Sequence, residues 1–470
     1  MGPKFRDAWY YPPEIAHDLD GLDKLSDALK QEAYACAWEY TRCVIPQYTN
    51  WKRYVAFMRI IIMGIIAEFR GDLVDVETSD SILGYSLTGT LDELFAGTPG
   101  HELMAREYKT FLLVTAEKAS KQRNSELFRR YVNGLASSPR VWFRMRDCDA
   151  LARFTMAAAL ACNDLDAVWP SDAEFELLAE IGDTLYDAVA FYKHRSEGET
   201  NSTFGYVPAS LRVDAFRVAR ETLWAVDVAL ARRPEGPVLM NFVRFFGGPI
   251  HMMMRRYRFV EEDLTVGRAE TSDVVAQTRK NVKLWNRVDA TMTNGSSSEH
   301  HHNHHQLAEE APHGDRYRDL VRNRTDDLMF PELPEILERA GTPHCDRCRY
   351  RASYGAKLIH RFGGVELCHG CRAMWRGYVE SLPERAKEVY PELVLRAPPA
   401  LEEASKKKAT ENNVEASGTN ATIQRLTDEY VPDTPRPLVD GDLEKALLNG
   451  IMDGTPNYTH GMPAMQAINV

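Results

Sequence analysis

The most restrictive feature of this sequence is a helical spacing of apolar residues that persists from about residue 24 to residue 290. Apolar side chains recur three and four positions apart, which is the period of one face of an α-helix. The segments with this spacing are 23–44, 101–120, 125–135, 149–162, 172–194, 211–233 and 236–264. Short turn sequences such as GTPG (97–100) and SSPR (137–140) separate them. The pattern predicts an all-α fold in which successive helices pack as a bundle.

Composition and charge limit the functions that such a bundle could serve. The chain has 470 residues, 44% of them hydrophobic, which is enough for a large core. The formal net charge of -11 argues against a nucleic-acid partner, because phosphate binding normally requires a basic face. Residues 1–22 lack the apolar stretch of a secretory signal, and the most apolar run, 58–69, is shorter than the about 20 residues of a membrane span. We therefore expect a cytoplasmic protein without stable membrane insertion.

Four parts can be distinguished along the chain. Residues 1–290 form the predicted helical core. Residues 291–315 lack an apolar period and carry five histidines between 300 and 305, so we predict a histidine-rich flexible insertion there. Helical spacing resumes in 316–396, whereas 397–470 is polar and low in large apolar side chains. We expect this last part to be mostly disordered.

Two CxxC pairs stand in the C-terminal helical part. Cys345 with Cys348 and Cys368 with Cys371 are separated by nineteen residues and can supply four thiolates to a tetrahedral ion. Four protein ligands leave no open position for catalysis, so the spacing predicts a structural zinc site. Residues 341–380 also carry seven Lys or Arg against three acids. A zinc-finger nucleic-acid-binding or regulatory protein with a helical partner-binding domain is therefore the alternative function.

A group of charged residues lies at the end of the segment 172–194. Asp183, Asp187 and His194 share one helical face, and Lys193 stands beside it. Carboxylates on one face suit magnesium, which proteins usually hold by one or two carboxylates together with substrate phosphates. A solvent-facing stripe with a basic helix end would have the same spacing. The spacing leaves both interpretations open.

Two further segments carry matching chemistry. Glu68, Asp72 and Asp75 follow the most apolar helix at positions i, i+4 and i+7, which suggests a second wall of carboxylates. Arg256 and Tyr257 belong to a group of guanidinium and phenol donors suited to a diphosphate. Each of these residues could also lie on an ordinary surface.

The stretch YDAVAFYKHR (186–195) resembles the second metal motif of class I terpene synthases, where Asn-Asp, Ser and Lys-Glu recur at i, i+4 and i+8. Asp187 and Lys193 match this motif. The other three motif positions hold Tyr186, Ala190 and His194.

Two more elements strengthen this resemblance. The RRYR sequence (255–258) is similar to the diphosphate-binding Arg-Tyr element of fungal sesquiterpene synthases. FRGDLVDVE (69–77) falls where their aspartate-rich motif would be.

A closer resemblance covers nearly everything from residue 9 to the cysteine pairs. The segments that carry it are 38–71, 127–135, 142–155, 160–166, 180–195, 197–204, 241–262 and 354–368. They resemble the α-ionylideneethane synthases, the fungal sesquiterpene synthases of abscisic acid biosynthesis. The resemblance implies a fungal source, a class I terpene-synthase-like helical bundle, farnesyl diphosphate as the small-molecule substrate, and Mg2+.

The resemblance also implies a carbon–oxygen lyase reaction. Loss of diphosphate gives an allylic cation, deprotonation isomerises it to an acyclic conjugated polyene, and reprotonation drives ring closure. The diphosphate-binding residues would be Arg146, Lys193, Arg256 and Tyr257. The magnesium ligands would be Glu68, Asp72, Asp75, Asp183 and Asp187. The candidates for proton transfer are Glu68, His101 and His194.

Overall fold

A computed structural model describes residues 10–119, 125–135, 137–197, 202–205, 207, 211–254, 266, 268, 271, 273–274, 310–342, 344–350 and 365–393. The chain forms two compact units, Met1–Leu395 and Arg396–Val470, and the second lies outside the described residues. The predicted disordered tail 397–470 therefore lies outside them as well. Of the predicted insertion 291–315, only 310–315 is described, and it belongs to a helix.

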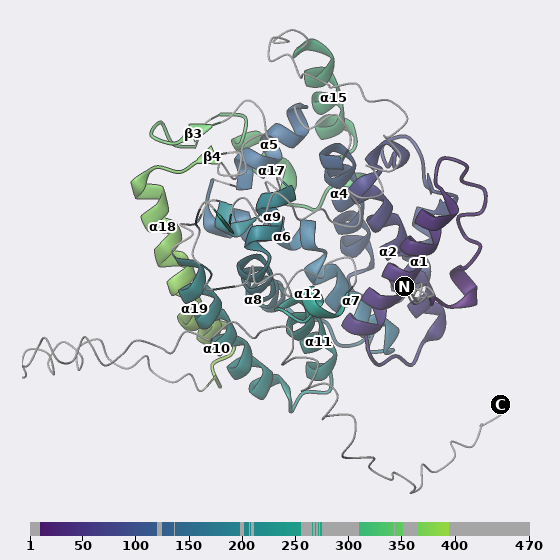
Figure 1. The fold of residues 1–470 in the computed structure, drawn as a ribbon, viewed down its shortest axis with the longest axis horizontal. Helices are drawn as coiled ribbons and strands as arrows, with labels where there is room; N and C mark the ends of the chain where they lie inside the picture. Colours follow the sequence, from purple (N-terminus) through teal and green to yellow (C-terminus); the bar gives the residue numbers. More distant parts are fainter. Residues whose placement is uncertain are drawn as a thin grey trace, which may run out of the picture. The chain divides into compact units, whose positions relative to one another are not determined.

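The described residues are mainly helical, which confirms the predicted all-α fold (Figure 1). The helices of the first 200 residues are α1 (Asp27–Val44), α2 (Trp51–Phe69), α3 (Leu87–Phe95), α4 (His101–Ala119), α5 (Glu126–Leu135), α6 (Pro139–Ala150), α7 (Ala152–Cys162), α8 (Asp172–Val189) and α9 (Phe191–Glu197). The later helices are α10 (Arg212–Leu230), α11 (Gly236–Phe246), α12 (Ile250–Met253), α15 (Glu310–Asn323), α16 (Thr325–Leu328), α17 (Leu333–Arg339), α18 (His369–Glu380) and α19 (Leu382–Val389).

Strands are confined to two short antiparallel hairpins in the described residues. The first pairs β1 (Ser81–Ile82) with β2 (Tyr85–Ser86), and the second pairs β3 (Arg349–Tyr350) with β4 (Val365–Glu366). Short 3-10 turns occur at Pro13–Ile15, Gly71–Leu73 and Thr203–Gly205.

Side-chain caps fix where the main helices begin. Ser26 accepts a hydrogen bond from the backbone of α1, and Asn50 does the same at the start of α2. Ser171 and Glu174 form a reciprocal capping box at the start of α8. These caps satisfy backbone N–H groups that have no partner within the helix.

The core is built around two helices that are apolar on nearly all sides. Every residue of α7 is buried, and α7 contacts α2, α6, α8 and α11. Helix α2 is buried along most of its length and packs on α1, α3 and α4. A helix that is apolar all round belongs in the interior of a protein, and this explains why 58–69 is a core helix. No helix among the described residues is long and apolar enough to span a membrane.

Two helices end earlier than the apolar period predicts. The segment 172–194, expected to be one helix, is broken at Ala190 into α8 and α9. The segment 236–264 is broken after α11 at Gly247 and Gly248, where Gly248 has a positive φ of 149°. Helix α2 ends at Phe69, so Asp72 and Asp75 do not continue the helical face of Glu68. The spacing of these three acids therefore does not place them on one helical face, and the second wall of carboxylates stays a prediction.

The C-terminal helices pack on the outside of the bundle. Helices α15, α16 and α17 contact α4 and α5, and Arg106 on α4 donates to the carbonyl of Met329 at 2.6 Å. Helices α18 and α19 contact α10, and α19 also contacts α8. Figure 1 shows α18 and α19 in green along one side of the helices, beside α10.

Candidate active site and cysteine cluster

Arg146 on α6 and Asp187 on α8 form an ion pair inside the bundle. Arg146 donates from Nη2 to Asp187 Oδ1 at 2.8 Å and from Nε to Asp187 Oδ2 at 3.2 Å. The side chain of Arg146 is 5% exposed and that of Asp187 is fully buried. Two parallel hydrogen bonds fix the orientation of both groups. Two residues that the sequence analysis assigned separately, one to the diphosphate and one to the metal, thus lie in contact.

Thr203 completes the hydrogen bonding of Asp187. Its backbone N–H donates to Asp187 Oδ2 at 2.8 Å, and its hydroxyl lies 2.7 Å from the same oxygen. The indole Nε1 of Trp142 donates to the Thr203 hydroxyl at 3.0 Å. Asp187 therefore has donors on both carboxylate oxygens, as a buried carboxylate requires.

Asp183 lies one turn before Asp187 on α8 and is bonded quite differently. It is fully buried, and neither carboxylate oxygen has a hydrogen-bond partner among the described residues. Burial raises the pKa of Asp183 well above its usual range, and the charge of Asp187 raises it further, while Arg146 opposes the shift. Burial therefore favours the neutral form of Asp183.

His194 on α9 adds a neutral base to this group. Its Nδ1 is 3.7 Å from Asp187 Oδ1, beyond hydrogen-bonding distance, and has no partner among the residues that the structure describes. Burial and the neighbouring charges of Lys193 and Arg146 lower the pKa of His194 well below its usual range. A neutral imidazole can accept a proton.

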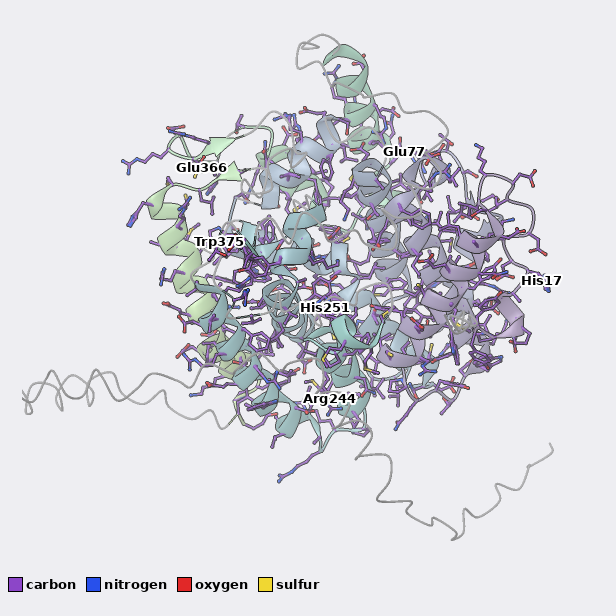
Figure 2. The ribbon with its side chains drawn as sticks, in the orientation of Figure 1. His17, Glu77, Arg244, His251, Glu366 and Trp375 are labelled. Carbon is purple, nitrogen blue, oxygen red and sulfur yellow. The ribbon has the colours of Figure 1, made fainter. Side chains whose placement is uncertain are left out.

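Aromatic rings cover one side of the charged group. The ring of Tyr186 stacks on Phe246 with centroids 4.4 Å apart, and it lies 4.6 Å from the ring of His251. Lys193 Nζ is 3.4 Å from the Tyr186 hydroxyl. Figure 2 labels His251, whose side chain is fully buried. Charged groups and π faces therefore meet here in an environment that excludes water.

The acidic segment after α2 lies at the same end of α4 as this site. Lys118, near the end of α4, donates to Asp149 Oδ1 at 3.1 Å, and Arg146 Nη1 donates to Asp149 Oδ2 at 2.8 Å. Gly71, just beyond α2, lies so close to the carbonyl of Ala116 on α4 that a Cβ would not fit. The ends of α2, α4, α6 and α8 therefore approach one another.

The other predicted acids have different surroundings. Glu68, on the last turn of α2, is partly buried. Asp72 forms two hydrogen bonds of 2.9 Å with Arg70, and Asp75 accepts two backbone N–H groups of the turn that follows it. Both of these aspartates serve local surface structure, and their role as magnesium ligands stays a prediction.

The remaining predicted site residues lie apart from this group or outside the described residues. His101, the first residue of α4, lies 2.8 Å from Asp92 in a half-exposed pair. Arg256 and Tyr257 fall outside the described residues.

A second set of buried charges lies on another face of α6. Arg144 pairs with Glu107 on α4, and Arg153 donates from Nε to Asp147 Oδ2 at 2.5 Å. The backbone N–H of Arg153 donates to Asp147 Oδ1 at 2.8 Å. Both oxygens of Glu107 and both oxygens of Asp147 thus have donors. We call these four residues the Glu107 network.

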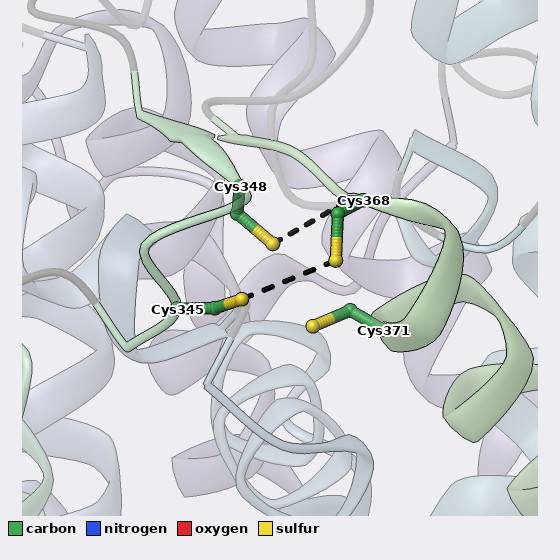
Figure 3. A group of neighbouring side chains, drawn as sticks. All are labelled: Cys345, Cys348, Cys368 and Cys371. Atoms are coloured by element: carbon green, nitrogen blue, oxygen red, sulfur yellow. Dashed lines mark hydrogen bonds between the residues drawn. The ribbon is translucent and has the colours of Figure 1, made fainter.

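The four cysteines of the CxxC pairs converge in space. The sulfur atoms of Cys345, Cys348, Cys368 and Cys371 all lie within 4.8 Å of one another. Figure 3 shows the four side chains pointing toward a common centre. The sulfurs of Cys345 and Cys368 are 3.9 Å apart, too far for a disulfide and close to the about 3.8 Å edge of a tetrahedron with metal–sulfur bonds of about 2.3 Å. The cluster could hold a metal ion.

The backbone around these cysteines suits thiolate ligands. The N–H of Cys368 donates to the sulfur of Cys348 at 3.3 Å. A hydrogen bond from the N–H of Cys371 is the main reason that the pKa of Cys368 is lowered to about 7, whereas burial raises the pKa of Cys348. Metal binding would have to displace the proton from Cys348.

The residues that orient the site could not be recognised in the sequence. Thr203 lies in an irregular stretch with no periodicity, and Lys118 and Asp149 look like ordinary helix-surface charges. Asp149 follows Arg146 at i+3, which was the one available signal. Trp142 lies one turn before Arg146, and an apolar spacing does not reveal the hydrogen bond that its indole makes.

These observations define a class of protein: a helical bundle whose interior holds two aspartates, an arginine and an imidazole beside aromatic rings. The chain belongs to the α-ionylideneethane synthase family, since the family described as "Alpha-ionylideneethane synthase aba3" matches residues 7–392. It is 67% identical over 444 residues to "Alpha-ionylideneethane synthase abl3" of Pyricularia oryzae, covering 85% of this chain and 86% of that protein.

Two further relatives agree. "Alpha-ionylideneethane synthase aba3" of Botryotinia fuckeliana is 64% identical over 388 residues, covering 83% of this chain and 84% of the relative. "Alpha-ionylideneethane synthase abl3" of Leptosphaeria maculans is 61% identical over 390 residues, covering 83% of this chain and 87% of the relative.

Proposed function

We propose that this protein is a sesquiterpene synthase that converts farnesyl diphosphate to α-ionylideneethane in an abscisic-acid-type pathway. Family membership supports the product, because the relatives carry that activity in their names. The observation that carries the chemistry is the fully buried Asp183, without a hydrogen-bond partner among the described residues and one turn from the Arg146–Asp187 pair. A structural carboxylate would have donors, so an unpaired one favours a ligand-binding role.

Arg146 and Lys193 are the proposed diphosphate-binding residues among those described. Arg146 already directs its guanidinium into the site, and Lys118 adds a second positive charge through Asp149. Arg256 and Tyr257 are proposed to complete this group. A guanidinium binds phosphate oxygens through a planar pair of N–H donors, which is the geometry that a departing diphosphate presents.

Asp183 and Asp187 are the residues that we propose hold Mg2+, together with Glu68. The donor set fits magnesium, because its oxygen atoms are the ligands that this ion prefers. When bound, magnesium would neutralise the charge that develops on the leaving diphosphate. A magnesium ion can bind Asp183 only if the proton of that acid is released, so magnesium affinity should rise with pH. Asp72 and Asp75 remain proposed as further ligands.

Proton transfer is assigned to His194, with Glu68 and His101 as the other candidates. His194 is neutral and buried beside the charged group, so it can take the proton that an allylic cation releases when the polyene forms. The same proton can return to the polyene and start ring closure, because imidazolium is an acid. The cyclised cation must then lose a proton, so the net change is loss of diphosphate and one proton from the substrate. The rings of Tyr186 and Phe246 can stabilise the cation without reacting with it.

Product analysis tests this function. Purified full-length protein is incubated with farnesyl diphosphate, with and without Mg2+, and the hydrocarbons are identified by gas chromatography and mass spectrometry. We expect α-ionylideneethane only when Mg2+ is present. Asp187→Asn should reduce turnover at least about 100-fold, while Asp172→Asn, an exposed residue on the first turn of the same helix, should leave it unchanged.

Three results would contradict the proposal: a folded protein that makes no hydrocarbon, product formation without Mg2+, or full activity of Asp187→Asn. The nucleic-acid-binding alternative predicts instead a zinc-dependent, salt-sensitive association with nucleic acid and no turnover.

A further inference from the structure

Helix α18 connects the cysteine cluster to the interior of the bundle. Cys371 belongs to the first turn of α18, and Trp375 follows it by one helical turn. Residues four apart lie on neighbouring positions of one helical face. Whatever fixes the sulfur of Cys371 therefore also fixes the position and rotation of Trp375.

Trp375 inserts between aromatic side chains of α6. Its side chain is fully buried, and its ring meets that of Trp142 edge to face, with centroids 5.8 Å apart and planes at 80°. One turn further along α18, Tyr378 stacks on Phe143 with centroids 5.9 Å apart. Figure 2 labels Trp375 on α18. These two contacts join α18 to α6, the helix that carries Arg146.

A second connection joins the same region to α8. The hydroxyl of Tyr378 donates to Glu180 Oε2 at 3.1 Å, and Arg385 on α19 donates to the same oxygen at 2.6 Å. Glu180 is buried and lies one turn before Asp183. The C-terminal helices therefore contact both α6 and α8, the helices that carry Arg146 and Asp187.

The decisive contact is the hydrogen-bond chain from Trp142 to Asp187. The indole N–H of Trp142 can only donate, and the carboxylate of Asp187 can only accept. The hydroxyl of Thr203 between them lies 3.0 Å from the indole nitrogen and 2.7 Å from Asp187 Oδ2. The hydroxyl must therefore accept from Trp142 and give its single proton to Asp187.

We propose that a metal ion held by Cys345, Cys348, Cys368 and Cys371 positions Asp187 through Trp375, Trp142 and Thr203. The chemical class of the ion is a soft, tetrahedral divalent cation, for which Zn2+ is the biological candidate. The metal fixes the start of α18, Trp375 supports the indole of Trp142, and that indole orients the Thr203 hydroxyl. Trp375, Trp142 and Thr203 are positioning residues. This inference rests on the proposed function in one respect, the participation of Asp187 in the reaction.

Metal content and tryptophan emission test the connection without substrate. Full-length wild-type protein purified with zinc should contain one Zn2+ per chain more than the Cys371→Ser variant. Loading with Co2+ should give the absorption bands of a tetrahedral thiolate complex. The control is Cys43→Ser, a partly buried cysteine outside the cluster. Loss of zinc in Cys371→Ser should shift tryptophan emission, and the shift should be reduced in a Trp375→Phe background. Absence of zinc, or zinc loss with unchanged emission, would overturn the proposal.

Kinetics test the last step of the chain. Thr203→Val keeps the shape of the side chain and removes the hydroxyl, so turnover should fall about tenfold, the value of one hydrogen bond to a charged group. Thr203→Ser, which restores the hydroxyl, should recover activity to within about twofold. The KM for farnesyl diphosphate should change less than kcat. Equal activity of Thr203→Val and Thr203→Ser would overturn the role of Thr203.

One variant separates positioning from folding. If Cys371→Ser fails to fold, Trp375→Leu in the zinc-loaded protein removes the same support while leaving the metal site intact. It should lower kcat with zinc content unchanged, and unchanged kcat would overturn the connection. If the wild-type protein makes no terpene at all, the proposed function fails, while zinc content and tryptophan emission still decide whether the metal controls the position of Trp142.

Discussion

Two sets of buried charges contact α6 on opposite sides, through residues only a few positions apart in the sequence. One is the Asp187 site, which consists of Arg146, Asp183, Asp187 and His194, and the other is the Glu107 network. Their hydrogen bonds differ. In the Glu107 network, each oxygen of Glu107 and Asp147 receives a hydrogen bond from Arg144 or Arg153. In the Asp187 site, Asp187 is fully bonded but Asp183 has no hydrogen-bond partner among the described residues.

The difference separates a structural from a functional use of buried charge. A buried carboxylate whose two oxygens both receive hydrogen bonds from arginine fixes the packing of helices. An unpaired buried carboxylate lowers stability, and such a group persists where a ligand or a reaction needs it. We therefore assign the two carboxylates of the Glu107 network to the fold and Asp183 to the chemistry; Arg144 Nε and Arg153 Nη2 of the network have no hydrogen-bond partner among the described residues.

The largest expected effect is on turnover when Asp183 is changed. Asp183→Asn keeps the size of the side chain and removes the carboxylate that magnesium would bind, so turnover should fall about 1000-fold, or about 4 kcal/mol of activation free energy. The free energy of unfolding should stay unchanged or increase, because the folded protein no longer has to bury an unpaired acid. Steady-state kinetics and urea denaturation measure the two quantities. If Asp183→Asn is less stable but fully active, Asp183 serves the fold and not the reaction.

The converse effect is expected in the Glu107 network. Glu107→Gln leaves the buried guanidinium of Arg144 without its main counter-charge, which should reduce the free energy of unfolding by about 3 kcal/mol. Turnover per folded molecule should change less than about fivefold, an effect of under about 1 kcal/mol. Urea denaturation followed by circular dichroism gives the stability. Loss of turnover at unchanged stability would show that this network also takes part in the reaction.

The pH dependence of stability sharpens the comparison further. The pKa of Asp183 is about 3.9 in the unfolded chain. Burial raises the pKa of this group in the folded protein. Above about pH 4 the folded state therefore holds a proton that the unfolded state has lost. The stability from this group is complete below about pH 4 and declines as pH rises through the folded pKa, by up to about 1.4 kcal/mol per pH unit.

Asp183→Asn removes this titration. In magnesium-free buffer, the difference in unfolding free energy between Asp183→Asn and the wild type should increase in favour of the variant from pH 5 to pH 8. Urea denaturation at each pH measures it. Parallel curves for the two proteins would show that Asp183 is not a protonated acid in the folded state.

The smallest effect is expected at the surface. Asp72→Asn removes an exposed pair with Arg70, so the free energy of unfolding should change by about 0.5 kcal/mol or less. Turnover decides whether Asp72 is a magnesium ligand. A fall in turnover of the size expected for Asp183→Asn would place Asp72 in the site, and unchanged turnover would assign it to the surface turn alone.

The sequence predicted the parts of this structure that depend on local periodicity. The helical spacing gave the all-α fold, the separation of Asp183 and Asp187 by four positions put them on one face of α8, and the CxxC spacing brought four sulfurs together. The break at Ala190 was missed, because the apolar period continues across that position. Thr203 and Lys118 could not be predicted, since their roles arise only when α6 meets α8 and α4.

The contact between Glu180 and Arg385 also has a consequence for how the protein is made. These residues are 205 positions apart, so a ribosome that has completed α8 has not yet synthesised the arginine that neutralises its buried carboxylate. In the nascent bundle, Glu180 lacks the hydrogen bonds from Arg385 until α19 emerges from the exit tunnel. A chain truncated before Arg385 should therefore depend on chaperones and be degraded in cells, although every helix that carries the reaction chemistry would already be present.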